Sequence, residues 1–194
     1  RHAKVEQVPC FESLSQLRAS KIAVDCVALC TPPAVRLAMA REALDYGWHL
    51  LIEKPPTPTV GELLAMEAYA RKKKRVLYAA WHSRYNRSVD MAKAKLKGQH
   101  VNFLKVTWKE DVRKWHPGQE WIWQPGGFGV FDPGINALSI VTKILPEPIF
   151  ADSATIEVPA NASTPIAANI RFKRGDGAAA DLSARVREAA AFKG

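Results

Sequence analysis

The sequence predicts an α/β protein whose first part forms a parallel sheet and whose second part is an α+β region with an antiparallel sheet. In residues 24–80, short apolar runs alternate with segments of helical periodicity. This alternation is typical of a parallel sheet with helices on its faces. Beyond Trp81 an alternating strand, a long loop and an apolar helix replace that pattern. We therefore expect two domains, residues 1–81 and residues 82–194.

Each element of the first domain has its own signal. Mainly apolar runs predict buried strands at residues 24–30, 48–52 and 76–80. Helical spacing predicts a helix over residues 34–46, which Gly47 ends, and a second over residues 59–73. Thr59 and Glu62 form a capping box at the start of the second helix. Thr31 and Lys54 then follow the ends of two parallel strands, where sheets of this kind bind ligands.

The second domain is predicted to contain a helix over residues 88–97 and an alternating strand over residues 101–109. A loop without clear secondary structure covers residues 110–131, and a helix follows over residues 133–145. Asp132 is expected to be the N-cap of this helix, because Pro133 suits the first helical position. Strand-like segments come next, with a hairpin turn at residues 173–177. Residues 178–194 are rich in alanine, a poor strand former, and depart from the expected pattern.

Composition indicates a globular protein and excludes several functional classes. The chain has 194 residues, of which 47% are apolar and 24% charged. No apolar run is long enough to cross a membrane and no signal-peptide core is present, so we expect a cytoplasmic protein without a membrane partner. The net charge of +9 suggests nucleic acid, but the densest basic run, residues 71–75, ends a predicted helix, where cations complement the helix dipole. We expect no nucleic-acid partner.

The cysteines do not predict a metal site. Cys26 and Cys30 lie close in sequence but within one predicted strand. Four residues of extended chain separate them by roughly 13 Å, too far for a disulfide or a shared tetrahedral ion. We expect reduced thiols and no bound metal.

Two segments far apart in the sequence supply side chains suited to catalysis. Lys54 stands where an apolar strand ends in a charged pair and a double proline. Asp132 and Asn136, four residues apart, lie on one face of a predicted helix start, at its positive end. A carboxylate can remove a proton, an ammonium can stabilise developing negative charge, and an amide can orient a hydroxyl.

The motif Glu53-Lys54-Pro55, with a later glycine-rich turn and the run D-P-G-I-N at residues 132–136, resembles the glucose-fructose oxidoreductase / inositol dehydrogenase (Gfo/Idh/MocA) family. The tryptophan-rich segments at residues 108–113, 115–117 and 121–124 are most similar to those of its L-arabinose and D-galactose 1-dehydrogenases. The resemblance extends to about Pro148. It implies a Rossmann-type dinucleotide-binding domain, followed by a substrate domain.

The resemblance also implies an activity: oxidation of an aldose at C1 to the lactone, with NADP or NAD as hydride acceptor. Asp132 and Lys54 would be catalytic, Asp132 as the candidate base and Lys54 as the cation; the sequence does not decide which of the two finally carries the proton. A sugar would contact a further set of side chains, His82, Glu110, Trp115, His116 and Asn136. The cofactor would contact Arg1, Thr31, Pro32, Glu53 and Lys54; an arginine at that place could bind the 2′-phosphate of NADP.

Several readings remain open. L-arabinose and D-galactose differ by one hydroxymethyl group, so the sequence does not choose between them. Another sugar or inositol dehydrogenase of the same family is an alternative. The sequence does not start with Met and contains no G-x-G-x-x-G turn, so we expect a chain incomplete at its start and, given residues 178–194, at its end. An inactive fragment or a non-catalytic binding protein is therefore a further alternative, and a homo-oligomer is possible.

Overall fold

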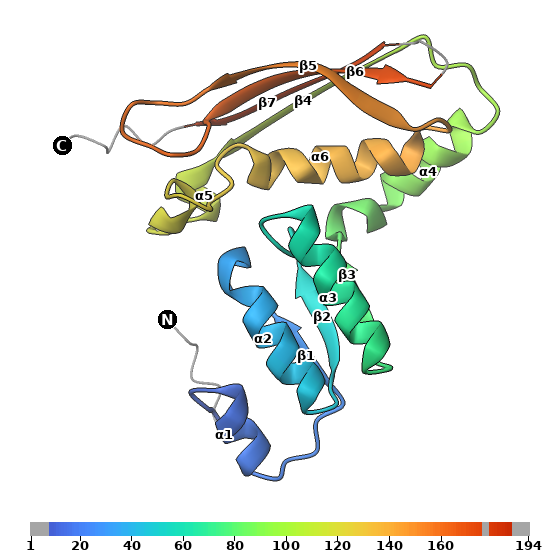
Figure 1. The fold of residues 1–194 in the computed structure, drawn as a ribbon. Coiled ribbons are helices and arrows are strands. Elements are labelled where there is room, and N and C mark those ends of the chain that lie inside the picture. The colour runs from blue at the N-terminus through green and yellow to red at the C-terminus, as the bar shows by residue number, and fades with distance from the viewer. Residues whose placement is uncertain (1–7, 176–178, 188–194) are drawn as a thin grey trace. The chain divides into compact units, whose positions relative to one another are not determined.

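The computed structural model describes residues 8–175 and 179–187, and Figure 1 shows the arrangement of their elements. The chain divides into two compact units, residues 1–80 and residues 81–194. The first unit contains the helices α1 (Leu14–Ala19), α2 (Pro33–Asp45) and α3 (Val60–Lys72) and the strands β1 (Cys26–Leu29), β2 (His49–Glu53) and β3 (Leu77–Ala80). The expected alternation of strands and helices is present, and α1 is a helix that the sequence pattern did not predict.

The first unit is built on a parallel sheet in the order β1-β2-β3. Val27 pairs with Leu50, and Leu50 pairs in turn with Leu77. Helices α2 and α3 pack against each other, and α2 packs against the sheet. Leu44, Leu50, Ile52 and Met66 are fully buried between these layers. Burial of this apolar surface is the main stabilising term for the unit, and it leaves the carboxyl ends of all three strands at one edge.

The second unit begins with a short 3₁₀ helix, η1 (His82–Tyr85), and α4 (Arg87–Leu96). Strand β4 (Phe103–Asp111) leads into α5 (Val112–Trp115) and the 3₁₀ helix η2 (Glu120–Ile122). Helix α6 (Phe131–Ile144) follows, and the chain continues through β5 (Ile149–Glu157), β6 (Ala167–Arg174) and β7 (Ala179–Arg187).

A sheet in the order β4-β7-β6-β5 forms the body of the second unit, and α6 lies along one face of it (Figure 1). The pairs β5–β6 and β6–β7 are antiparallel, whereas β4 joins β7 in parallel. Ala137 of α6 and Phe172 of β6 are buried together between helix and sheet. The α/β fold class expected from the sequence is confirmed, with the sheet antiparallel throughout except at β4.

Two expectations about individual elements were wrong. Asp132 is not the N-cap of α6, because the helix begins at Phe131 and its N-cap is Val130. A turn at Gly129, with φ of +51°, and a hydrogen bond from the Val130 amide to the Pro165 carbonyl (2.6 Å) start the helix earlier. Asp132 therefore lies within the first helical turn. The second wrong expectation concerns the alanine-rich segment, which forms a strand over residues 179–187. Pairing with both β4 and β6 stabilises this extended chain despite the low strand propensity of alanine.

The long loop expected at residues 110–131 contains α5 and η2, and the hairpin turn expected at residues 173–177 falls partly outside the described residues. Cys10, Cys26 and Cys30 are free thiols. Within residues 8–175 and 179–187, no helix is long and apolar enough to span a membrane. In the same part of the chain, no three His, Cys, Asp or Glu side chains gather where they could hold a metal ion.

Candidate functional site

In the first unit, four residues predicted to contact a cofactor gather at the carboxyl ends of β1 and β2. Thr31 and Pro32 follow β1, and Pro32 is the residue that precedes helix α2. Glu53 is the last residue of β2, and its side chain accepts a hydrogen bond from the Lys54 amide (3.1 Å). Neighbouring parallel strands place these residues at one edge because their carboxyl ends coincide. Arg1, the fifth predicted cofactor residue, lies outside the described residues.

Arg36 of helix α2 joins these strand ends. Its side chain is only 4% exposed, and its Nε donates to the Thr31 carbonyl at 2.6 Å. Its Nη1 donates to the carbonyls of Glu53 and Pro55. A buried cation of this kind is tolerated because carbonyl oxygens replace its water. The guanidinium thus holds the backbone on both sides of Lys54 in place.

In the second unit, Asp132 and Asn136 are both buried on the first turns of α6, with exposures of 4% and 7%. Their spacing of four residues places both side chains near the same face of the helix. The amino end of a helix stabilises negative charge, so the site favours the ionised form of Asp132. A hydrogen bond from the Ser139 hydroxyl to the Asn136 carbonyl (2.7 Å) lies one turn further along.

His116 contacts Asp132 directly. The distance from His116 Nε2 to Asp132 Oδ2 is 3.0 Å, and the side chains are 23% and 5% exposed. His116 follows helix α5, and its amide donates to the Val112 carbonyl at 2.7 Å. The structure therefore brings together a predicted sugar-binding residue and the predicted catalytic base, which are 16 positions apart in the sequence.

Gln119 and Trp121 complete a polar cluster around His116. Nδ1 of His116 lies 3.2 Å from Gln119 Oε1, which also accepts a hydrogen bond from the Trp121 indole nitrogen at 3.1 Å. The rings of His116 and Trp121 meet edge to face, with their centres 6.4 Å apart. His116 thus has a hydrogen-bond partner at each ring nitrogen and an aromatic neighbour.

The other predicted sugar contacts lie elsewhere in the second unit. His82 is exposed at the start of η1, and its Nδ1 lies 3.4 Å from the Ser83 hydroxyl. Glu110, near the end of β4, accepts a hydrogen bond from the Trp108 indole (2.7 Å). Trp115 is 58% exposed, and the Lys114 ammonium lies 4.9 Å from its ring centre. These three side chains thus contact Ser83, Trp108 and Lys114.

Sequence reasoning missed Arg36 and Gln119. A detectable signal existed for both. Arg36 stands four residues before Ala40, so it lies on the helix face that must be buried. The run His116-Pro117-Gly118-Gln119 fits a type II turn, with proline and then glycine at its centre. Such a turn returns Gln119 to His116.

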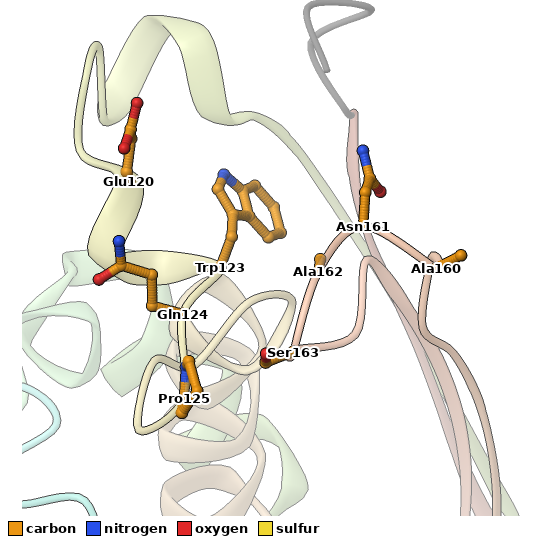
Figure 2. Close-up of a pocket in the computed structure, with 8 residues that line it drawn as sticks. All are labelled: Glu120, Trp123, Gln124, Pro125, Ala160, Asn161, Ala162 and Ser163. Atoms are coloured by element: carbon orange, nitrogen blue, oxygen red, sulfur yellow. The ribbon is translucent and has the colours of Figure 1, made fainter. Parts of the chain in front are cut away.

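A hollow of about 380 Å³ lies beside the tryptophan-rich loop (Figure 2). One wall is formed by η2 and the segment after it, and the other by the connection between β5 and β6. None of the predicted site residues lines it. The lining residues are Glu120, Trp123, Gln124, Pro125, Ala160, Asn161, Ala162 and Ser163.

Comparison with known proteins supports the family assignment. The model of an oxidoreductase family with an NAD-binding Rossmann fold, Gfo/Idh/MocA, matches residues 1–81. A galactose 1-dehydrogenase of Pseudomonas fluorescens is 46% identical over 166 residues, which are 84% of this chain and 52% of that protein. Residues 1–81 thus carry the NAD-binding part of a Gfo/Idh/MocA oxidoreductase. The chain spans about half the length of the Pseudomonas fluorescens relative.

Solved structures agree with this match. A D-galactose-1-dehydrogenase protein from Rhizobium etli is 47% identical with a TM-score of 0.89, over 96% of this chain and 60% of that one. An inositol dehydrogenase homologue from Azotobacter vinelandii, complexed with NADH and myo-inositol, has a TM-score of 0.73 at 19% identity, over 87% of this chain and 46% of that one. The second likeness concerns the fold alone. Both are consistent with a Rossmann-type unit followed by a separate sheet.

Proposed function

We propose that the protein oxidises an aldose, L-arabinose or D-galactose, at C1 to the lactone with NADP or NAD as hydride acceptor. The observation that carries this proposal is the buried Asp132 carboxylate at the start of α6, in contact with His116 at 3.0 Å. The likeness to two galactose 1-dehydrogenases supports the substrate class. In this proposal residues 1–81 form the cofactor domain and residues 82–194 the substrate domain.

Asp132 is the proposed catalytic base. Oxidation at C1 requires a group that removes the proton of the anomeric hydroxyl, while a bound nicotinamide supplies the hydride acceptor. Asp132 takes that proton, and the hydride leaves the carbon, so the C1–O bond becomes the carbonyl of the lactone. The start of α6 and the neighbouring imidazole both favour the carboxylate form that this step needs. Burial also keeps bulk water away from the base, which limits side reactions with solvent.

Lys54 is the second proposed catalytic residue. An ammonium near the reacting oxygen stabilises the alkoxide that develops as its proton leaves. Lys54 follows β2, where Arg36 holds the flanking carbonyls of Glu53 and Pro55. Held there, the lysine would also reach the ribose next to the nicotinamide. The same strand ends would contact the cofactor through Thr31, Pro32 and Glu53, which fits the usual ligand edge of a parallel sheet.

The proposed sugar contacts are His82, Glu110, Trp115, His116 and Asn136. Asn136 cannot titrate, so its amide would orient a sugar oxygen next to Asp132. Glu110 and His82 would accept hydrogen bonds from hydroxyl groups. The exposed indole of Trp115 offers a flat apolar face for the C–H groups of a pyranose ring.

Two alternatives predict different results. Another sugar or inositol dehydrogenase of the same family would oxidise a different polyol at the same residues. A non-catalytic binding protein, or an inactive fragment, would bind sugar or nothing at all and transfer no hydride. The second alternative rests on the G-x-G-x-x-G turn that cradles a cofactor pyrophosphate, which does not occur among these 194 residues.

A panel of aldoses and cyclitols, tested with NAD and with NADP, separates these readings. Formation of the reduced nicotinamide is followed by its absorbance at 340 nm. We expect this absorbance to rise with L-arabinose or D-galactose and to stay constant with myo-inositol. Turnover of a cyclitol alone would favour the first alternative. If NADPH and NADH bind, as followed by their fluorescence, but no sugar or cyclitol is oxidised, the protein is a binding protein. Lack of binding as well would identify an inactive fragment.

A further inference from the structure

Two side chains, Gln119 and Trp121, fix the proton on Nδ1 of His116. The indole nitrogen of Trp121 can only donate a hydrogen bond, and it lies 3.1 Å from Gln119 Oε1. This contact decides the orientation of the Gln119 amide, since its oxygen must face the indole. The same oxygen lies 3.2 Å from Nδ1 of His116. Because an amide oxygen only accepts, Nδ1 of His116 must carry a proton.

The other ring nitrogen of His116 faces a second acceptor. Nε2 lies 3.0 Å from Asp132 Oδ2, a distance at which two acceptors without a proton between them would repel. With Nδ1 already protonated, the proton in this contact makes His116 an imidazolium beside a carboxylate, or a neutral imidazole beside a carboxylic acid. Of the two, the imidazolium beside the carboxylate is the form we infer, because Asp132 lies at the amino end of α6, which favours negative charge. The His116–Asp132 pair then holds one proton more than a neutral histidine beside an ionised aspartate.

Local backbone geometry holds Gln119 in this place. The Gln119 amide donates to the His116 carbonyl at 3.2 Å, and Gly118 between them has φ of +70°. These are the features of a type II turn with Pro117 and Gly118 at its centre. A type II turn requires a positive φ at its third residue, which glycine adopts without strain. The turn returns the Gln119 side chain to the ring that precedes it by three residues.

We propose that Gln119 is a positioning residue that makes His116 a hydrogen-bond donor at both ring nitrogens and thereby holds the extra proton on the His116–Asp132 pair. This inference deepens the proposed function, on which its catalytic meaning rests. A positively charged His116 keeps Asp132 ionised and fixed in direction before the sugar arrives. Without Gln119 the ring can carry its single proton on Nε2 alone, and the extra proton is lost.

Nitrogen-15 NMR of the His116 ring tests the inference without any need for activity. In the unchanged protein at pH 7 we expect both ring nitrogens to show the shifts of protonated nitrogen. In Gln119→Leu, Nδ1 should change to the shift of an unprotonated nitrogen. Gln119→Glu should restore the protonated shift, because a carboxylate also accepts from Nδ1. Gln124→Leu, a matched change of an exposed glutamine in the same loop, should leave the His116 spectrum unchanged.

Trp121→Phe tests the orientation of the amide separately. Phenylalanine keeps most of the ring but has no N–H, so the Gln119 amide becomes free to rotate and to offer its NH₂ group to Nδ1. We expect a mixture of protonated and unprotonated Nδ1 signals. An unprotonated Nδ1 in the unchanged protein, or the same His116 shifts in Gln119→Leu as in the unchanged protein, would overturn the inference.

Kinetics then connect the inference to turnover. Gln119→Leu should lower kcat about tenfold or more, as expected for loss of a hydrogen bond to a charged group, and leave the KM for the cofactor nearly unchanged. Gln119→Glu should recover most of that loss. If the NMR shifts change as expected but even the unchanged protein oxidises no sugar, the proposed function fails and the positioning role of Gln119 stands. Full activity of Gln119→Leu together with unchanged shifts would remove the positioning role.

Discussion

Nε of the buried Arg36 donates a hydrogen bond of 2.6 Å to the carbonyl of Thr31, at the edge where the parallel strands of the first unit end. Since the same guanidinium also donates to the carbonyls on both sides of Lys54, one side chain of α2 connects the ends of β1 and β2. A ligand site at this edge therefore depends on a residue that a ligand need not touch.

Arg36→Met should destabilise the first unit and weaken cofactor binding. Methionine fills similar space but leaves three carbonyls without their donor, so we expect the free energy of unfolding to fall by about 1–3 kcal/mol. Urea denaturation measures this loss, and NADPH fluorescence measures affinity. Arg41→Met, a change of an exposed arginine on the same helix, is the control and should alter neither quantity. Equal effects of the two changes would show that Arg36 acts through helix stability alone.

Asp132→Asn should abolish turnover while the protein stays folded. Asparagine has nearly the same shape but cannot accept the hydroxyl proton, so we expect kcat to fall by about 10²–10⁴-fold. Initial rates with D-galactose and a thermal denaturation curve measure the two effects. Asp152→Asn alters a carboxylate of β5 that pairs with Lys173 at 2.5 Å and should leave kcat unchanged. Normal activity in Asp132→Asn would remove Asp132 from the proposed mechanism.

Two adjacent glycines before α6 should respond differently to alanine. A Cβ on Gly127 would lie 2.3 Å from the Trp121 carbonyl oxygen, so the backbone of η2 would have to move. We expect Gly127→Ala to cost about 3 kcal/mol of unfolding free energy. Gly126 has φ of +83° and open space around it, so Gly126→Ala should cost about 1–2 kcal/mol through backbone strain alone. Urea denaturation compares them; a larger cost at Gly126 would contradict the close approach.

An ion pair in the first unit should contribute stability that depends on pH. The Lys73 ammonium lies 2.6 Å from Asp45 Oδ1, and the Tyr69 hydroxyl donates to the same oxygen at 2.7 Å. The hydrogen bond from Lys73 and then that from Tyr69 lower the pKa of Asp45 below its usual 3.8. Because the folded pKa is the lower one, this stability is complete above pH 3.8 and is lost as the pH falls through the folded pKa.

Asp45→Asn should therefore be less stable than the unchanged protein at pH 7, and the two should converge in acid. Urea midpoints measured from pH 7 down to pH 2 follow this convergence. Glu67→Gln breaks an exposed pair with Arg71 on α3 and serves as the control, since such pairs contribute little. A difference between Asp45→Asn and the unchanged protein that stays constant in acid would contradict the linkage.

The face of the second unit's sheet opposite α6 should mediate self-association. Phe103 of β4 and Phe150 of β5 belong to one cross-strand row that runs through Ala179 and Lys173. The two phenylalanines are 55% and 60% exposed, whereas Phe172, one position from Lys173, is buried towards α6. Residues in one row point to the same side of a sheet, so both rings lie on the face opposite α6.

We expect a homodimer or larger assembly, measured by size-exclusion chromatography with light scattering. Phe150→Glu and Phe103→Glu should reduce the measured mass by adding charge to an apolar contact. Glu157→Gln, at the end of β5, is the control: it adds no charge and should leave the measured mass unchanged. A monomer at every concentration of the unchanged protein would contradict the prediction.

Local pattern predicted the parallel part of the fold well. The apolar runs at β1, β2 and β3 and the capping box before α3 depend on neighbours close in sequence, and the described elements follow them closely. The start of α6 and the strand β7 were predicted wrongly, because each depends on a distant partner. Pro165 helps to start the helix, and ladders to β4 and β6 hold an alanine-rich segment extended.

The sequence by itself determined the family resemblance, the fold class and the residue types on which the proposed chemistry depends, such as Lys54 and Asp132. These features reside in short motifs whose spacing is visible along the chain. Only the tertiary structure decided that His116 contacts Asp132, that Gln119 faces His116, and that Arg36 joins two strand ends. The reason is physical: a hydrogen bond is a contact of about 3 Å between particular atoms, and periodicity predicts the face of a helix but not which distant side chain lies against it.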